Sequence, residues 1–249
     1  MNVRRGLIVG AAALLLVVFP AFAGNPDAPN LCSNGTCVCP GADPLTPEVA
    51  ADVIYMREEE KLARDVYIAM EEAWEMQIFT NIAQSEQRHM DSVLTLITCY
   101  GLTDPVVDDT PGVFTDPTLA ALYTTLVTSG LNSRLEALMV GALIEELDIS
   151  DLQAALAQSD NADVDRVFEN LLCGSENHLR SFATQLAMLD ATYTAQYLTQ
   201  EEFDAIAASP RVPCGLNQNG PQLHGDRDRI HDQIHLRDQL RTGRPELIK

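Results

Sequence analysis

Four long stretches of this chain carry apolar residues at the spacing of an α-helix, and this pattern most restricts the folds that the chain can adopt. The long helices are predicted at residues 47–75, 78–100, 133–158 and 162–190, with shorter ones at 118–129 and near 199–208. Thr46 and Pro47 supply an N-cap and a first-position proline for the first helix. Strand-like alternation is nearly absent, so the sequence predicts an all-α fold.

The connection between the second and third long helices is itself long. Residues 101–131 contain three prolines and have room for one short helix. Adjacent antiparallel helices need only a short turn, whereas this connection can return along a helix of about 35 Å. One such crossover is typical of ferritin-like bundles. We therefore expect a ferritin-like four-helix bundle over residues 46–208.

Both ends of the chain lie outside this expected bundle. Residues 1–23 combine a basic pair, an apolar run and a small-residue motif ending at Ala23, which predicts a cleaved signal peptide and a secreted or periplasmic protein. An uncleaved membrane anchor is the alternative, although Pro20 interrupts the apolar run. Residues 24–45 are expected to form an irregular arm, and residues 209–249 a polar tail that is flexible or marginally helical.

The charge of the chain limits its partners. It has 36 acidic and 16 basic side chains and a formal net charge of −20. Such a surface repels nucleic acid and anionic lipid and attracts cations. We therefore expect no nucleic-acid partner, and no membrane contact once the signal peptide is removed.

Six cysteines follow the predicted cleavage point: Cys32, Cys37, Cys39, Cys99, Cys173 and Cys214. An even number in an oxidising compartment favours disulfides, but the spacing selects no pairing. A zinc site from the first three cysteines and Cys214 is one alternative, although a C-x2-C spacing is missing. A second alternative is a metal site on the tail, formed by His224, Asp228, His231, His235 and Asp238 on one helix face.

The apolar faces of the first two long helices contain side chains that can bind metal. On the first helix, Glu59 falls near the middle of the face, whereas Glu58 and Glu60 fall to either side and are expected to be solvated. On the second helix, Glu86 and His89 both fall within the face and occupy adjacent positions on it.

The third and fourth long helices carry similar residues. Glu145 and Glu146 straddle the apolar face of the third helix, so at least one of them should reach the core. His178 lies in the middle of the fourth face. These residues all lie near the middle of their helices, so antiparallel packing would bring them to similar heights.

Together these residues predict a metal site shared by four helices. Buried carboxylates are rare unless they are paired or bind metal. Two-metal sites in helix bundles use a glutamate from each of two helices and a Glu-x-x-His from each of the other two. The chain supplies three of these parts, but Ser175 stands where the last glutamate is expected, three residues before His178. Glu146, Asp148 or water is left to fill that position.

Four motifs in order carry a family resemblance. They are Glu-Glu-Glu-Lys-Leu-Ala-Arg-Asp at 58–65, Ser-Glu-Gln-Arg-His-Met at 85–90, Ile-Glu-Glu-Leu-Asp-Ile at 144–149 and Gly-Ser-Glu-Asn-His-Leu-Arg at 174–180. Over residues 47–207 the chain resembles an uncharacterised prokaryotic family of ferritin-like domains. The resemblance implies the ferritin-like fold and a di-iron or di-manganese centre, without a settled substrate.

The sequence therefore favours an exported metal-dependent oxidoreductase of the peroxidase or oxidase type. Two metal ions, with iron favoured over manganese, would react with dioxygen or peroxide. The expected ligands are Glu59, Glu86, His89, Glu145 or Glu146, and His178. The alternatives are a non-enzymatic metal-binding protein and a structural helical bundle, and a homo-oligomer is left open. No phosphate loop, dinucleotide fingerprint or nucleophile elbow is present.

Overall fold

The computed structural model describes residues 32–33, 36–37 and 44–214. Its helices are α1 (Pro47–Trp74), α2 (Gln77–Cys99), α3 (Pro117–Gly130), α4 (Arg134–Gln158), α5 (Ala162–Met188) and α6 (Gln200–Ala208). Two short strands, β1 (Cys32–Ser33) and β2 (Thr36–Cys37), pair in an antiparallel sense. The all-α prediction is confirmed. The predicted signal peptide, most of the arm and the tail beyond residue 214 lie outside the described residues.

Side-chain caps fix where the helices begin. Thr46 Oγ1 accepts the backbone N–H of Val49 at the start of α1, and Asn161 Oδ1 accepts that of Val164 at the start of α5. At the other end of α1, Glu75 adopts a left-handed conformation (φ 52°). Because α2 begins two residues later, α1 and α2 form a tight helical hairpin.

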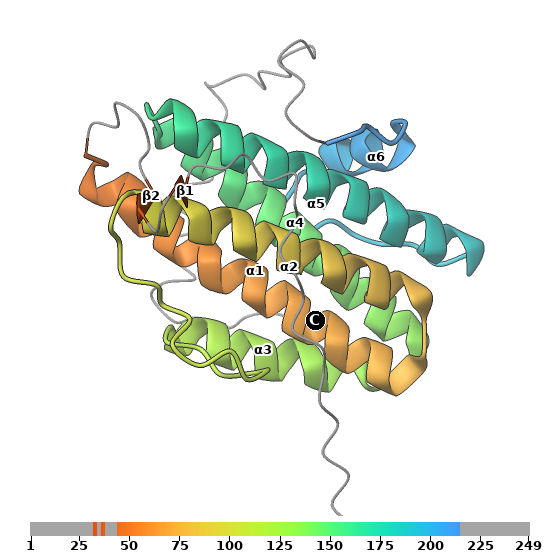
Figure 1. The fold of residues 1–249 in the computed structure, drawn as a ribbon. Coiled ribbons are helices and arrows are strands. Elements are labelled where there is room, and N and C mark those ends of the chain that lie inside the picture. Colours follow the sequence, from red (N-terminus) through yellow and green to blue (C-terminus); the bar gives the residue numbers. More distant parts are fainter. Residues whose placement is uncertain (1–31, 34–35, 38–43, 215–249) are drawn as a thin grey trace, which may run out of the picture. The chain divides into compact units, whose positions relative to one another are not determined.

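The four long helices α1, α2, α4 and α5 lie side by side, as Figure 1 shows. Helix α1 packs along α2, and α4 packs along α5, so two hairpins face each other. Helix α3, which belongs to the crossover, packs against α1 and α4, and α6 packs against α5. Among the described residues, no helix is both long and apolar enough to cross a membrane.

The buried apolar residues form two separate clusters, one on either side of a polar level. One cluster contains Tyr67, Phe79 and Phe182, whose ring centroids lie 5.5–6.1 Å apart. The other contains Val53 and Phe168. Each long helix contributes to both clusters, and the polar residues that it buries near its middle lie between them. This polar level is therefore closed by apolar packing on two sides.

Ion pairs hold the crossover against the outer face of α1. Arg57 lies 3.2 Å from the carboxylate of Asp104, and Arg64 lies 2.6 Å from that of Asp109. Between these two pairs, the buried Lys61 amine lies 2.5 Å from Asp65 on its own helix. The crossover therefore shields the outer face of α1 from solvent.

Glu58 is part of this covered surface, and the expectation that it is solvated is wrong. Its side chain is buried, and its carboxylate accepts the backbone N–H groups of Thr115 at 2.5 Å and Asp116 at 2.9 Å. Both donors lie in the part of the crossover directly before α3. One glutamate of the charged run on α1 thus binds the backbone of a loop that is distant in sequence.

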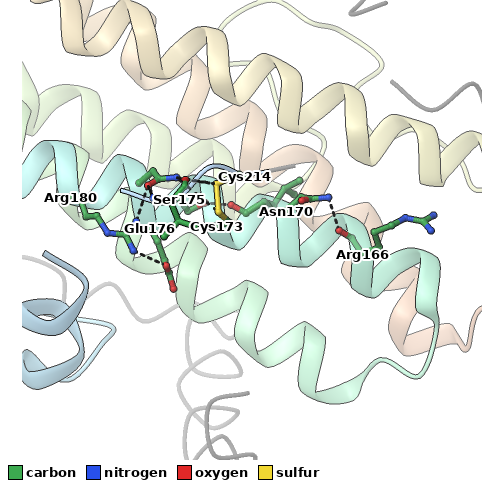
Figure 2. The surroundings of a disulfide bond; sticks show 10 residues. Arg166, Asn170, Cys173, Ser175, Glu176, Arg180 and Cys214 are labelled. Atoms are coloured by element: carbon green, nitrogen blue, oxygen red, sulfur yellow. Dashed lines mark hydrogen bonds and ion pairs between the residues drawn. A yellow bond between two sulfur atoms is a disulfide. The ribbon is translucent and has the colours of Figure 1, made fainter. Parts of the chain in front are cut away.

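Residues 209–214 are held against α5. Cys173 on α5 forms a disulfide with Cys214, as Figure 2 shows. Asn177 donates to the Val212 carbonyl at 2.8 Å and accepts its N–H at 3.1 Å. The described start of the expected tail is therefore neither loose nor helical, and the disulfide contradicts the zinc alternative that used Cys214.

We predict that Glu58→Ala destabilises the protein, because it leaves two backbone N–H groups without their carboxylate acceptor. The expected loss is about 2–3 kcal/mol of unfolding free energy, measured by urea denaturation. Glu72→Ala is the matched control, since Glu72 is an exposed glutamate on the same helix, and it should change the free energy by less than about 0.5 kcal/mol. Equal losses in the two variants would contradict the anchoring role.

Candidate metal centre

Five side chains from four helices meet in the polar level, with Glu86 at their centre. Glu86 Oε2 lies 2.8 Å from Nδ1 of His89, and Oε1 lies 2.9 Å from Nδ1 of His178. A second carboxylate approaches the same nitrogen of each imidazole. Glu60 lies 3.1 Å from His89 Nδ1, and Glu145 lies 3.4 Å from His178 Nδ1. The two rings are nearly parallel, with centroids 5.5 Å apart.

These atoms form two groups that could each hold a metal ion. One group is Glu60, Glu86 and His89, and the other is Glu86, Glu145 and His178. Within each group the candidate ligand atoms all lie within 4.8 Å of one another. Glu86 belongs to both groups because it offers one oxygen to each imidazole.

Several of these buried atoms are short of hydrogen bonds. Both oxygens of Glu86, Oε1 of Glu60 and Nδ1 of His178 have no hydrogen-bond partner among the described residues, although charged neighbours stand within 3 Å of Glu86. Glu86 is thus at ion-pair distance from both imidazoles without the alignment of a hydrogen bond, so its oxygens are stabilised by charge and not by an aligned donor. Buried polar atoms in this situation cost free energy unless a further group satisfies them.

The charges of the cluster shift its pKa values strongly. Burial lowers the pKa of His178, but the adjacent Glu86 and Glu145 carboxylates outweigh burial and raise it to about 10. In the same way, Glu60 and Glu86 raise the pKa of His89 well above its usual value. Burial opposes the ionised form of Glu86, yet the two imidazoles hold its pKa below the usual range. The carboxylates therefore favour the protonated form of both imidazoles.

Two further polar side chains support the carboxylates. The hydroxyl of Tyr67 donates to Oε1 of Glu145 at 2.5 Å, which orients that carboxylate. The hydroxyl of Ser175 donates to Asp148 and to the Leu171 carbonyl. Asp148 is buried beside Glu60 and Glu145, and burial followed by these two charges raises its pKa. Of the three groups considered for the position left by Ser175, Asp148 is the one that hydrogen-bonds to Ser175, but it belongs to neither of the two groups.

The structure brings some of the predicted metal ligands together and places others elsewhere. Glu86, His89, Glu145 and His178 are brought together. Glu146 is not in either group: its carboxylate accepts the Tyr193 hydroxyl at 2.6 Å and the Leu198 N–H at 3.2 Å. It thereby holds the segment between α5 and α6.

Glu59 is buried but also lies outside both groups. Its charge acts on Tyr197, whose pKa rises to about 12 through burial, followed by Asp151, Glu59 and Glu146. Glu60 takes the position that was expected for Glu59, and the expectation that Glu60 is solvated is wrong. Glu60 is only 1% exposed.

A stricter spacing would have found Glu60. Residues spaced alternately by three and four form the buried seam of α1: Val53, Met56, Glu60, Ala63, Tyr67 and Met70. The same spacing in α2 gives Phe79, Ile82, Glu86, His89, Val93 and Leu96. Helix α1 is buried on almost every side, so its apolar residues do not define one face. The average direction of these residues therefore pointed to Glu59 instead of Glu60.

Gly174 allows α5 to approach the His89 ring. A Cβ atom at this position would lie 2.5 Å from Nε2 and 2.6 Å from Cε1 of His89. The ring is thus confined between Gly174 and the carboxylates of Glu60 and Glu86, with Nδ1 directed at the carboxylates.

Comparison with known proteins identifies the family. The model of the family described as "Uncharacterized protein domain (DUF2202)" matches residues 50–210. The chain belongs to this family. All five residues of the two groups lie within the matched region, so the cluster is part of the family domain and not of an appendage to it.

Relatives of this DUF2202 domain protein are found in an archaeon. The uncharacterized protein MJ0754 of Methanocaldococcus jannaschii is 48% identical over 175 residues, which cover 70% of this chain and 94% of that protein. The crystal structure of the hypothetical protein MJ0754 from Methanococcus jannaschii is similar with a TM-score of 0.68 and 46% identity, covering 69% of this chain and 98% of that chain. The similarity extends over the helical domain.

We predict that Gly174→Ala displaces the His89 ring and destabilises the protein by about 1–3 kcal/mol, measured as a loss of unfolding free energy. The His89→Ala background supplies the control, because it removes the atoms that the new Cβ would strike. In that background the same substitution should be neutral or stabilising, since alanine favours a helix interior over glycine by about 1 kcal/mol. An identical cost in both backgrounds would show that the His89 contact is not the cause.

Proposed function

We propose that this protein is a ferritin-like four-helix-bundle oxidoreductase whose two metal ions react with dioxygen or peroxide. The observation that carries the proposal is the position of Glu86 between two histidines. Each of its oxygens lies within 2.9 Å of a different imidazole nitrogen, and neither oxygen has a hydrogen bond among the described residues. A carboxylate shared in this way suits a bridge between two cations.

The ferritin-like assignment is supported by the order and chemistry of the helices. Two hairpins, α1–α2 and α4–α5, are joined by one long crossover. Each hairpin offers a glutamate on its first helix and a histidine on its second, at one level of the core. This matches the arrangement of two-metal sites in bundles, except that Asp148 and Ser175 replace the last glutamate.

The donor set fits iron or manganese. Mixed carboxylate and imidazole ligands suit both metals, and a given site of this kind binds Fe²⁺ more tightly than Mn²⁺. Glu60 and His89 would hold one ion, Glu145 and His178 the other, and Glu86 both. When bound, the metals would supply the electrons that reduce the oxidant.

The protein residues would act by orienting and enclosing the site. Tyr67 fixes one oxygen of Glu145 and so leaves the other directed at His178. Gly174 prevents the His89 ring from turning away. The apolar clusters above and below the polar level limit the access of water. These features hold the ligand atoms in place before a metal arrives, which lowers the cost of binding it.

Export is a further part of the proposal. The Cys173–Cys214 disulfide is of the kind that persists in oxidising compartments, and it accords with the signal peptide expected at residues 1–23. A secreted or periplasmic location follows, with metal ions and a small oxidant as partners.

We predict that Glu86→Gln removes most of the bound metal. The change keeps the shape of the side chain but removes the charge that both groups share. After anaerobic loading with ferrous iron and desalting, elemental analysis should find about two ions per wild-type chain and less than one in the variant. Glu59→Gln, a buried control outside both groups, should retain the wild-type amount. Full metal content in Glu86→Gln, with helical circular dichroism intact, would overturn the metal assignment.

The same loaded protein tests for turnover. Rapid mixing with hydrogen peroxide and, separately, with air-saturated buffer should change the visible spectrum within seconds. Because the ferrous ions can be oxidised only once, repeated additions should give repeated consumption of the oxidant when ascorbate is supplied to reduce the metal again. If the ferrous protein stayed unchanged in both experiments, the oxidoreductase proposal would be wrong and the protein would be a metal-binding protein.

We also predict that metal binding releases protons. Because the pKa of His178 is raised to about 10, its imidazole is expected to be protonated at pH 7 and must lose a proton before Nδ1 can bind a metal. The pKa of His89 is shifted in the same direction. Affinity for Mn²⁺ should therefore fall as the pH is lowered, and the release from His178 should vanish above its pKa of about 10. Calorimetric titrations in two buffers of different ionisation enthalpy measure the number of protons, which His178→Gln should reduce by about one. Binding with no proton release at pH 7 would contradict the role of the imidazoles.

A further inference from the structure

A cavity of about 490 Å³ lies between α2 and α5, and it reaches His178. His178 therefore belongs both to the wall of this cavity and to the cluster around Glu86. The remaining wall is mostly polar and includes the hydroxyls of Ser85, Ser181 and Thr184. The cavity is large enough for a small molecule, and it is the described space from which such a molecule could reach the site.

The cavity wall has a charge opposite to that of the protein. The chain carries 36 acidic side chains, yet among the described residues no aspartate or glutamate lines this cavity. Its charged wall residues are Arg88 on α2 and Arg211 in the segment after α6. A cationic recess in a strongly acidic surface attracts anions locally while the rest of the surface repels them.

Both arginines lack a carboxylate partner among residues 44–214. By contrast, Arg57, Arg64, Arg166 and Arg180 each form an ion pair. Arg134 also has no carboxylate partner among these residues, but it lies alone outside the cavity, whereas Arg88 and Arg211 line the same cavity. Guanidinium groups match the oxygens of carboxylates and phosphates through paired hydrogen bonds.

Contacts on both sides of Arg211 fix the position of its backbone. The disulfide of Cys214 anchors the chain three residues after it, and Asn177 bonds the backbone of Val212 directly next to it. On the preceding side, Arg180 Nε donates to the Ser209 hydroxyl at 2.7 Å. Figure 2 shows Arg180 and the disulfide on the same helix. We refer to residues 209–214 as the strap, since they are fixed to α5 on both sides of Arg211.

We propose that this cavity binds a small molecule through an oxyanion, a carboxylate or a phosphate group, which Arg88 and Arg211 hold beside His178. The disulfide acts as a positioning device, because it keeps Arg211 at the cavity. That the bound molecule is a substrate or regulator of the metal site rests on the proposed function above, whereas the binding itself does not require metal.

The test uses the metal-free, disulfide-intact protein and isothermal titration calorimetry with two probes, inorganic phosphate and succinate. At least one probe should bind. Arg88→Gln and Arg211→Gln should each weaken it by about tenfold or more, as expected for the loss of a charge-assisted hydrogen bond. Arg134→Gln is the matched control, since Arg134 is exposed, has no carboxylate partner among the described residues and lies outside the cavity. It should leave the affinity unchanged.

The two probes distinguish the two sources of the oxyanion: binding of phosphate alone assigns a phosphate ligand, and binding of succinate alone a carboxylate ligand. Cys214→Ser should weaken binding about as much as Arg211→Gln, and combining the two changes should add little, because both remove the same guanidinium from the cavity. No binding of either probe, or an equal loss in Arg134→Gln, would overturn the proposal. Failure of metal loading would leave this result intact, so the two proposals fail separately.

Discussion

Burial of charge within a helical core is the constraint on which the rest of this structure depends. Four carboxylates and two imidazoles lie at one level of the four long helices, and each of these side chains is at most 8% exposed. Such groups are tolerated only when opposite charges, hydrogen bonds or a bound cation compensate them. Glu86 meets two imidazoles, Glu145 meets Tyr67 and His178, and Asp148 meets Ser175. The apolar clusters cover this level on two sides, and the cavity between α2 and α5 reaches it at His178.

A second set of buried charges performs a different task on the same helix. Arg57, Lys61 and Arg64 face the crossover and bind aspartates or backbone carbonyls there. Helix α1 thus separates two polar systems that differ in sign: carboxylates predominate toward the core, and cationic side chains bind the loop on the other side. The part of the crossover before α3 lies against this outer face through these contacts.

Local sequence patterns predicted the helices well, because caps and apolar periodicity are encoded within a few residues. The predicted helix of residues 78–100 agrees with α2 to within one residue at each end. The inward direction of Glu86, His89 and His178 also followed from periodicity, since α2 and α5 each have a polar face toward solvent. The choice of Glu60 over Glu59 did not follow, because a helix that is covered on all sides has no single apolar face. The burial of Glu58 and the strap at residues 209–214 depend on contacts with segments far away in sequence, which no local pattern records.

The two groups that share Glu86 differ in the length of chain that must be ordered to form them. Glu60, Glu86 and His89 all lie on the α1–α2 hairpin, and the Glu60–His89 contact spans 29 residues. Glu145 and His178 come from α4 and α5, so the second group needs the crossover and both hairpins. Contacts between nearby segments cost less loop-closure entropy and form sooner than contacts between distant ones. A folding chain can therefore assemble the first group while it is still half ordered, and the imidazole of His178 reaches Glu86 only when the complete native topology has formed.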